Sequence, residues 1–245
     1  MKAMILAAGL GTRLGKQTAE KPKALVKVNG AAMLENLIES LKKQEIKNIL
    51  INIHHHGQQV IDFVQEKENF GIDISFSDER NELLDTGGAI KKAAGFFEGN
   101  EPVLVHNVDV YSEINLNKLL EYHKKMKSFA TLCVRKRSSG RALIFNDEKQ
   151  LAGWTNLDEC KFKWVNESMN YFETFAYNGL FLADPQFAAN MPFEGKFSII
   201  DCWLKMAKTL KITAYIDESP AWFDFGTAEK INKAEQYLKN NKIKK

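Results

Sequence analysis

The sequence is poor in cysteine and proline and has no long hydrophobic run, and each shortage excludes a class of protein. Three cysteines (Cys133, Cys160 and Cys202), an odd number at wide spacings, fit neither a disulfide framework nor paired zinc ligands, so we expect a cytoplasmic protein. With 15 glycines and 5 prolines, collagen and low-complexity linkers are excluded. The apolar runs, such as residues 3–8 and 49–53, are far shorter than the roughly 20 residues of a membrane-spanning helix. We therefore expect no membrane partner.

The sequence also lacks an excess of charge of either sign. Lys plus Arg number 34 and Asp plus Glu 31, a net charge of +3, so nothing in the balance predicts a nucleic-acid partner. Hydrophobic residues make up 44% and charged residues 27%, which is an ordinary globular composition with enough apolar side chains for a core. No repeat or linker interrupts the chain. We expect one domain over residues 1–245, as a monomer or a small homo-oligomer.

Short apolar segments alternate with amphipathic ones along the first half of the chain. The predicted strands are residues 3–8, 49–53, 72–76 and 102–106, and the predicted helices are 33–41, 58–66, 88–94 and 116–126. This alternation predicts an α/β fold whose mostly parallel sheet is covered by helices on both faces. Further strands at 129–134, 142–145, 150–154 and 175–182 have few helices between them and predict a mixed sheet. Thr227 is a good N-cap for a C-terminal helix at about 227–240. The apolar start of the chain is expected to be the first buried strand and not a signal peptide.

Two glycines follow the first predicted strand and are joined by two basic residues. Gly9 and Gly11 allow main-chain N–H groups to approach phosphate oxygens, and Arg13 and Lys23 add positive charge. A dinucleotide-binding fingerprint fails because the third glycine is replaced by Leu14. A Walker A loop and a kinase glycine loop also fail, because the Gly-Lys-Ser/Thr ending and the His-Arg-Asp segment are missing. A polyphosphate cradle is the functional interpretation, and a plain tight turn is the alternative.

Two aspartates end apolar or aromatic segments far apart in the sequence. Asp109 follows the strand predicted at 102–106, and Asp224 lies between aromatic residues before Gly226. A carboxylate at the end of a buried strand is costly to desolvate unless it pairs with a cation. In nucleotide-binding proteins this cation is commonly the Mg²⁺ ion bound to the phosphates. A turn cap is the alternative for Asp109. One Mg²⁺ held by both aspartates would explain why each segment carries a carboxylate at this position.

Together these segments resemble the sugar-1-phosphate nucleotidylyltransferase family, also called NDP-sugar pyrophosphorylases. The matching segments are Leu-Ala-Ala-Gly-Leu-Gly-Thr-Arg-Leu from residue 6, Pro-Lys-Ala-Leu from residue 22, Asp-Thr-Gly-Gly from residue 85, Asn-Val-Asp from residue 107 and Trp-Phe-Asp-Phe-Gly-Thr from residue 222. The chain is similar in layout to short members, such as N-acetylmuramate-1-phosphate uridylyltransferases and mannose-1-phosphate guanylyltransferases. The resemblance implies a Rossmann-like nucleotide-diphospho-sugar transferase fold without a β-helix domain. Lys16, Val108 and a missing Glu-Lys-Pro segment depart from the family pattern.

The resemblance implies an enzyme that condenses an NTP with a sugar-1-phosphate to give an NDP-sugar and pyrophosphate, by Mg²⁺-assisted in-line attack. It assigns catalysis to Arg13 and Lys23 and the metal to Asp109 and Asp224. The residues that it assigns to nucleotide binding are Ala8, Gly9, Gly11, Thr12, Gly87 and Gly88, and those that it assigns to the sugar are Asn178 and Gly179. Products of this kind are precursors of cell walls and polysaccharides.

Two alternative functions use the same fold. A phosphocholine cytidylyltransferase-like enzyme would take phosphocholine as the acceptor, and a non-catalytic sensor would bind a nucleotide or sugar phosphate without turnover. The intact basic and acidic residues argue against the sensor. His54, His55 and His56 are not expected to bind a metal, because neighbouring side chains of a strand point to opposite faces.

Overall fold

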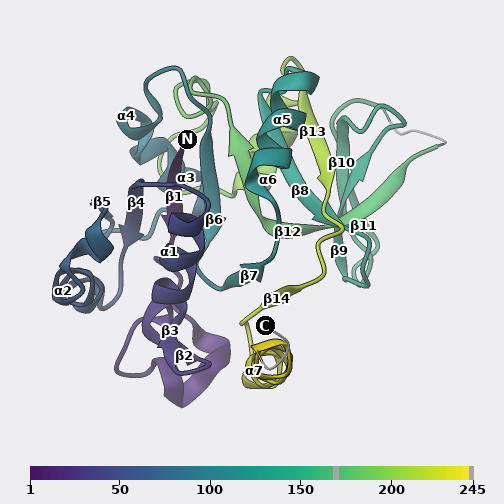
Figure 1. Ribbon diagram of the computed structural model, residues 1–245. Helices are drawn as coiled ribbons and strands as arrows, with labels where there is room; N and C mark the ends of the chain where they lie inside the picture. The colour runs from purple at the N-terminus through teal and green to yellow at the C-terminus, as the bar shows by residue number, and fades with distance from the viewer. Residues whose placement is uncertain (168–170, 243–245) are drawn as a thin grey trace. The chain divides into compact units, whose positions relative to one another are not determined.

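The structure, a computed structural model, describes residues 1–167 and 171–242, which form two compact units (Figure 1). Unit 1 comprises Met1, Leu84–Val105 and the described residues of Ile114–Ser219. Unit 2 comprises Lys2–Leu83, His106–Glu113 and the described residues from Pro220 onward. Each unit is therefore assembled from segments that are distant in the sequence. The expectation of one domain over the whole chain stays a prediction.

Unit 2 is built on three parallel strands in the order β1, β4, β5. They are β1 (Lys2–Leu6), β4 (Asn48–Ile53) and β5 (Asp73–Asp78), joined by the helices α1 (Met33–Lys43) and α2 (Gly57–Glu66). The register places Ile5 opposite Ile51 and Ile51 opposite Phe76. Nearly every side chain of β4 is buried, as expected for a parallel strand with both faces covered. The alternation of strand and helix predicted for this part of the chain is confirmed.

The helix α1 shows why the sequence pattern was informative. Leu34, Leu37, Ile38 and Leu41 recur at helical spacing and all are buried in the structure. Glu35 in its first turn and Lys42 and Lys43 in its last turn complement the helix dipole.

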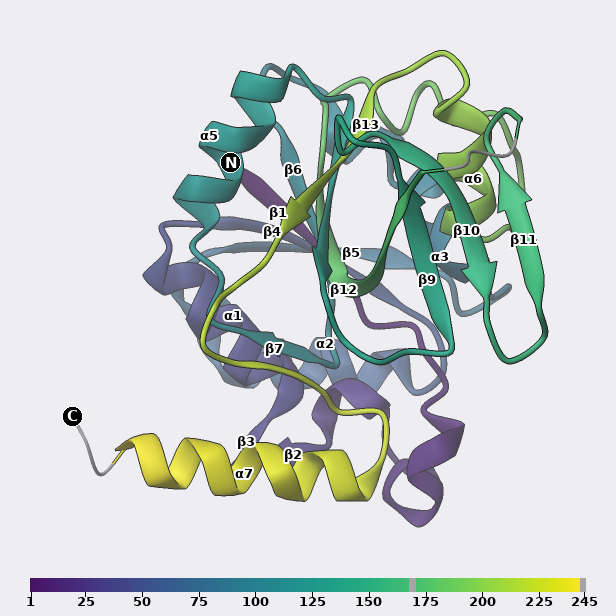
Figure 2. The same cartoon turned by 90° about the vertical axis from the view of Figure 1, so that its right-hand side faces the viewer.

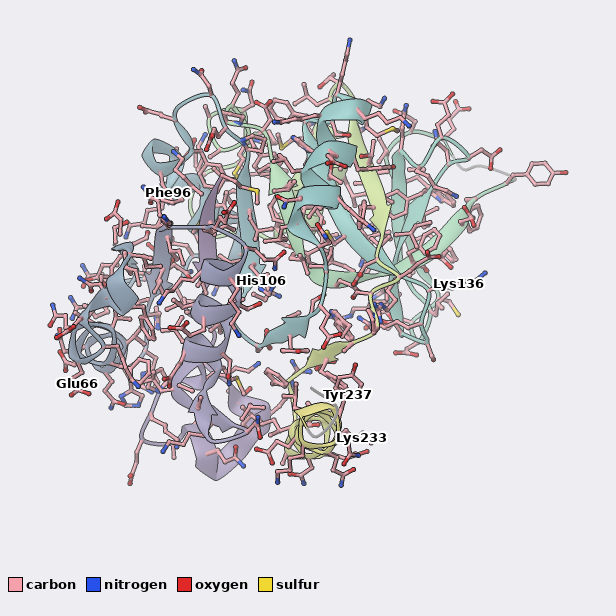
Figure 3. All side chains as sticks on the ribbon, viewed as in Figure 1. Glu66, Phe96, His106, Lys136, Lys233 and Tyr237 are labelled. Carbon is pink, nitrogen blue, oxygen red and sulfur yellow. The ribbon has the colours of Figure 1, made fainter. Side chains whose placement is uncertain are left out.

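Three 3₁₀ helices, two short two-stranded ribbons and a C-terminal helix complete unit 2. They are the 3₁₀ helices η1 (Thr12–Thr18), η2 (Lys23–Leu25) and η3 (Glu68–Gly71), the ribbons β2 (Lys27–Val28) with β3 (Ala31–Ala32) and β7 (Val110–Ser112) with β14 (Trp222–Asp224), and α7 (Ala228–Lys242). Figure 2 shows α7 running beside the β2–β3 ribbon. Ile231 and Ala234 of α7 join a buried apolar cluster with Val28. Tyr237, labelled in Figure 3, packs on Phe223 of β14 with ring centroids 5.3 Å apart.

Unit 1 contains the strands that pair partly antiparallel and partly parallel. Its elements are α3 (Asp85–Lys92), α4 (Ala94–Phe97), α5 (Leu116–Met126), β8 (Ala130–Arg135), β9 (Arg141–Phe145), β10 (Leu151–Asn156), β11 (Lys161–Trp164), β12 (Glu173–Ala183), α6 (Ile199–Met206) and β13 (Ile212–Ile216), while β6 (Val103–Asn107) begins in unit 1 and ends in unit 2. The strands β11, β10, β9 and β12 pair antiparallel in this order. β12 also pairs antiparallel with β8, and β8 pairs parallel with β13. The mixed sheet expected after residue 129 is confirmed.

The core of unit 1 centres on Trp203 of α6. This side chain is fully buried, and its ring meets Tyr177 and Phe181 edge to face with centroids 5.1 Å apart in each pair. Among the residues that the structure describes, no helix is long and apolar enough to cross a membrane.

Candidate functional site

The glycine segment forms a tight turn after β1. Gly11 has a φ of 66°, in the left-handed region, and the Leu14 N–H donates to its carbonyl over 2.9 Å. A Cβ atom at Gly11 would lie 2.9 Å from Thr18 Cγ2 and 3.0 Å from Lys23 Cβ, so only glycine fits without a shift. The turn thus packs on the stem of Lys23. Thr12 opens η1, and no long helix follows, which agrees with the failure of the dinucleotide-binding fingerprint.

The predicted first strand is two residues too long. β1 ends at Leu6, and the N–H groups of Ala7 and Ala8 donate to Asn52 Oδ1 over 2.6 and 3.3 Å. Gly9 follows, and a Cβ atom there would meet nothing within 4 Å. Asn52 was not among the predicted site residues. Its signal was present, because it is the one polar residue in the run Ile-Leu-Ile-Asn-Ile of residues 49–53.

Lys23 and Asp109 form an ion pair within unit 2. Lys23 opens η2 after Pro22, and it is only 8% exposed, which is rare for a lysine without a partner. Its Nζ contacts Asp109 Oδ2 directly. Asp109 lies in the turn between β6 and β7, beyond the carboxyl end of β6. A predicted phosphate-binding cation and a predicted metal ligand are therefore adjacent.

A second group of charges surrounds Asp224. Lys230 of α7 places Nζ 2.7 and 2.6 Å from the two carboxylate oxygens, and the Gly226 N–H donates to Asp224 Oδ1 over 3.2 Å. A Cβ atom at Gly226 would lie 2.9 Å from Asp224 Oδ1 and 3.4 Å from Arg13 Nη2. The guanidinium of Arg13 and the carboxylate of Asp224 thus meet at the same glycine. Lys230 is a further residue that was not predicted.

Pairing of β7 with β14 brings the two aspartates together. In this antiparallel ribbon Asp224 is opposite Val110, the residue after Asp109. The Phe225 N–H then donates to the Asp109 carbonyl over 2.8 Å. The two aspartates, distant in the sequence, thus lie on neighbouring segments of unit 2, because Asp224 ends β14 and Asp109 directly precedes β7. The structure gathers Arg13, Lys23, Asp109 and Asp224 within one unit.

His106 is the titratable residue next to this group. It is buried, and burial lowers its pKa to about 4, although Nδ1 is 2.8 Å from the Asn107 carbonyl (Figure 3). The imidazole is therefore neutral at pH 7 and is a poor candidate for a charged contact with phosphate.

The predicted nucleotide residues Gly87 and Gly88 belong to unit 1. Both are buried in α3, and the Gly87 N–H donates to the Phe197 carbonyl over 3.0 Å. A Cβ atom would lie 2.7 Å from that carbonyl at Gly87 and 2.1 Å from the Gly195 carbonyl at Gly88. The need for glycine at both positions is therefore explained by packing within unit 1. Their contact with a nucleotide stays a prediction.

The predicted sugar residues Asn178 and Gly179 lie at an irregularity of β12. The pairing with β8 shifts register between Tyr177 and Phe181, and Gly179 has a φ of 83°. Such bulges turn backbone groups out of the ladder. The Asn178 side chain is fully buried and donates to Asp217 Oδ2 over 2.9 Å. Its amide is thus engaged within unit 1, and its role toward a sugar stays a prediction.

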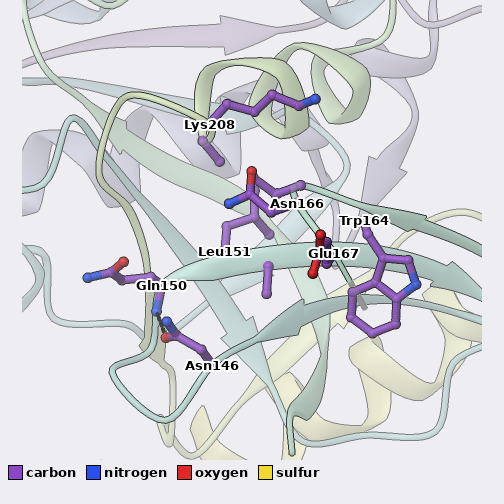
Figure 4. A pocket seen from close by; sticks show the side chains of 10 residues that line it. Asn146, Gln150, Leu151, Trp164, Asn166, Glu167 and Lys208 are labelled. Atoms are coloured by element: carbon purple, nitrogen blue, oxygen red, sulfur yellow. Dashed lines mark hydrogen bonds between the residues drawn. The ribbon is translucent and has the colours of Figure 1, made fainter. Parts of the chain in front are cut away.

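A pocket in unit 1 and the three adjacent histidines lie apart from the predicted site residues in the sequence. A pocket of about 800 Å³ in unit 1 is lined by polar residues such as Glu167 and Lys208 and by apolar residues such as Leu151 (Figure 4). His54, His55 and His56 follow β4, and no group of three His, Cys, Asp or Glu side chains in the described part of the chain is arranged to hold a metal.

Comparison with known proteins identifies the family. The model of the family described as Nucleotidyl transferase matches residues 2–142, so the chain belongs to the nucleotidyl transferase family. The resemblance found in the sequence is confirmed, and the match includes Arg13, Lys23 and Asp109.

Two relatives and one solved structure align over nearly the whole chain. The N-acetylmuramate alpha-1-phosphate uridylyltransferase of Caulobacter vibrioides is 28% identical over 241 residues, 96% of each chain. The D-glycero-alpha-D-manno-heptose 1-phosphate guanylyltransferase of Campylobacter jejuni is 30% identical over 230 residues, 94% of this chain and 96% of that protein. HddC from Yersinia pseudotuberculosis, solved complexed with GMP-PN, has a TM-score of 0.76 at 24% identity and covers 97% of this chain and 99% of that one. This likeness shows the fold, and the predicted α/β class with a mostly parallel mixed sheet is confirmed.

Proposed function

We propose that the protein transfers a nucleotidyl group from an NTP to a sugar-1-phosphate, giving an NDP-sugar and pyrophosphate. The observation that carries the proposal is the set of charges in unit 2, where Lys23 meets Asp109 and where Arg13, Asp224 and Lys230 gather around Gly226. Two cations, Arg13 and Lys23, and two carboxylates beside a glycine turn suit a metal-bound triphosphate. The names of two relatives, a uridylyltransferase and a guanylyltransferase that act on sugar 1-phosphates, support the same reaction.

Arg13 and Lys23 supply charge neutralisation in this proposal. In phosphoryl-type transfer most of the catalysis comes from positioning and from electrostatic stabilisation of the transition state. Arg13, at the end of the glycine turn, neutralises the leaving β- and γ-phosphates. Lys23, held against the same turn by Gly11, contacts the α-phosphate and the incoming phosphate.

The acidic residues fit Mg²⁺. Carboxylate oxygens are the ligands that Mg²⁺ prefers, commonly one or two of them together with substrate phosphates. Asp109 and Asp224 each pair with an ammonium group, from Lys23 and Lys230, so both carboxylates face a cation in the structure. When bound, Mg²⁺ supplies further neutralisation of the phosphate charge.

The proposed reaction needs no general base. The attacking sugar phosphate has a second pKa of about 6 and is mostly ionised at pH 7. This agrees with the state of His106, whose pKa of about 4 leaves it neutral and which is turned toward a backbone carbonyl.

Pyrophosphate release tests the proposal directly. ATP, CTP, GTP, UTP and dTTP are each paired with N-acetylmuramate 1-phosphate, a heptose 1-phosphate, mannose 1-phosphate, glucose 1-phosphate and phosphocholine, with Mg²⁺ and with EDTA. We expect one sugar pairing to release pyrophosphate, and only with Mg²⁺. If pyrophosphate is released only when phosphocholine is the acceptor, the proposed sugar-1-phosphate acceptor is wrong. NTP binding without release in any pairing would show a sensor.

A further inference from the structure

A buried hydrogen-bond chain lies under the start of the glycine turn. Asn52 is 3% exposed and Glu79 is 1% exposed, and both belong to unit 2. Asn52 Oδ1 accepts the N–H groups of Ala7 at 2.6 Å and Ala8 at 3.3 Å. Asn52 Nδ2 donates to Glu79 Oε1 over 2.8 Å. The chain runs from a buried carboxylate through one amide side chain to two main-chain N–H groups.

This arrangement is expensive to build. A buried carboxylate is costly to desolvate, and an amide is stable in a core only when both of its ends are satisfied. A carboxamide is suited to this position because its oxygen accepts from the backbone while its nitrogen donates to a carboxylate. An apolar side chain at residue 52 would match the rest of β4, whose flanking residues Ile51 and Ile53 are buried isoleucines.

The hydrogen bonds of Asn52 begin where the strand ladder stops. The β1–β4 register ends with Leu6 opposite Asn52. Beyond Leu6 the backbone pairing with β4 stops, and the N–H groups of Ala7 and Ala8 bond to the Asn52 side chain instead of to backbone carbonyls of β4. The direction of these two peptide groups fixes the path of the chain into Gly9 and the turn at Gly11.

We infer that Asn52 and Glu79 are positioning residues for nucleotide binding: Glu79 orients the Asn52 amide, and Asn52 orients the Ala7–Ala8 peptides at the base of the nucleotide loop. The inference rests on the proposed function, in which Ala8, Gly9 and Gly11 contact the NTP. Neither side chain contacts the nucleotide itself.

The directions of the hydrogen bonds provide the test. N52D keeps an acceptor for Ala7 and Ala8 but sets a second carboxylate oxygen against Glu79, and two such groups repel. In N52D/E79Q the new amide at position 79 can donate to the new carboxylate at position 52, so the hydrogen bond between the two side chains is restored with its direction reversed. N52A removes the chain altogether. N36A is the matched control, because the side chain of Asn36 in the same unit is also bonded to the backbone, where it donates to the carbonyls of Val28 at 3.1 Å and Ala31 at 3.3 Å.

Binding is measured by isothermal titration with Mg²⁺ and whichever of the five NTPs the wild type binds most tightly, without sugar phosphate. We expect Kd to rise about 10- to 100-fold in N52D and N52A, since buried donors lose their acceptor or its alignment. N52D/E79Q should recover most of the affinity, and N36A should bind as the wild type does. In active protein KM for the NTP should rise, with KM for the sugar phosphate unchanged. Amide exchange by NMR should accelerate at Ala7 and Ala8 in N52D.

The outcomes separate this inference from the proposed function. If the wild type never releases pyrophosphate but N52D weakens NTP binding and N52D/E79Q restores it, the proposed function is wrong and the inference holds. If Ala7 and Ala8 exchange faster while NTP affinity is unchanged, the pair is only a structural tie and the inference is overturned. Failure of N52D/E79Q to bind better than N52D, with both folded, overturns it as well, as does a wild type that binds no NTP.

Discussion

At the scale of single residues, the contacts of Arg13 and Lys23 predict large kinetic effects. Lys23 contacts Asp109, and the Arg13 guanidinium lies beside Gly226, as does the Asp224 carboxylate. Loss of one preorganised contact to transition-state charge costs about 3 to 4 kcal/mol, or roughly 10²- to 10³-fold in turnover. We expect that loss of kcat in Arg13→Ala and in Lys23→Ala, measured as pyrophosphate release with saturating substrates. Lys21→Ala, an exposed neighbour, is the control, and wild-type turnover in either variant would refute the role of that residue.

Lys230 predicts a change in metal dependence. Its ammonium group covers both oxygens of Asp224, and it must release them before a divalent cation binds there. Because the lysine is half exposed, the pair is worth about 1 kcal/mol or less, so Lys230→Ala should lower the Mg²⁺ concentration for half-maximal activity about two- to fivefold. Asp224→Asn should raise it.

The control is Lys233→Ala, because Lys233 lies on the same helix and pairs with Glu229 instead of Asp224. Mn²⁺ binding followed by electron paramagnetic resonance gives a readout that does not depend on turnover. A weaker metal site in Lys230→Ala would show that Lys230 assists the cation instead of competing with it.

Residue identities were predictable where a short motif carries the chemistry. Arg13 and Lys23 stand out because they accompany glycines after a strand. Lys230 did not stand out, since a lysine in the first turn of a surface helix is ordinary until β14 brings Asp224 next to it. Nothing local linked Asn52 to Glu79, because their contact depends on the pairing of β4 with β5.

At the scale of elements, strong periodicity gave accurate predictions and weak periodicity gave none. The helix predicted at 116–126 is observed as α5 with the same bounds. β11 was missed because its side chains are mostly exposed on both faces, so its residues show no alternation of burial. α6 begins after Ser198, whose side chain accepts the Ile200 N–H over 3.2 Å as an N-cap. β1 was predicted too long because the apolar run continues through Ala7 and Ala8 after the ladder has ended.

The N-terminus of α5 provides a prediction for an element. The side chain of Asn115 accepts the Lys118 N–H over 3.0 Å, which satisfies one of the free N–H groups of the first turn. Asn115→Ala should lower the free energy of unfolding by about 1 kcal/mol. Asn115→Ser keeps a capping oxygen and should cost only a few tenths of that amount. Urea unfolding followed by circular dichroism measures both, and equal stability of the two variants would contradict the cap.

At the scale of the whole molecule, the predicted site residues divide between the two units. Arg13, Lys23, Asp109 and Asp224 belong to unit 2, whereas Gly87, Gly88, Asn178 and Gly179 belong to unit 1. The sequence could not show this division, because each unit is assembled from separate stretches and no linker separates them. The hypothesis that Asp109 and Asp224 lie near each other came from their chemistry, whereas in the structure the pairing of β7 with β14 brings their segments together and each carboxylate pairs with its own lysine.

Two buried histidines predict how the stability of the folded chain depends on pH. Burial lowers the pKa of His106 to about 4 and also lowers the pKa of His123, whose Nδ1 is 2.8 Å from Thr131 Oγ1. The unfolded chain, with a histidine pKa near 6.5, binds more protons than the folded chain below that pH. The free energy of unfolding should therefore fall as the pH drops from about 6.5 to about 4, by about 3 kcal/mol for His106 alone. Below that range the contribution is constant.

Urea unfolding of the wild type, His106→Gln, His123→Gln and His55→Gln between pH 7.5 and pH 4 isolates this contribution. The two buried positions should lose part of the slope, because glutamine does not titrate. His55, a third histidine whose side chain is exposed, is the control position. Carboxylates of the chain also titrate in acid, but they are common to all four proteins and cancel in the comparison. A slope in His106→Gln equal to that of the wild type would mean that His106 has the same pKa in the folded and the unfolded chain, and the lowered pKa of the buried imidazole would then be wrong.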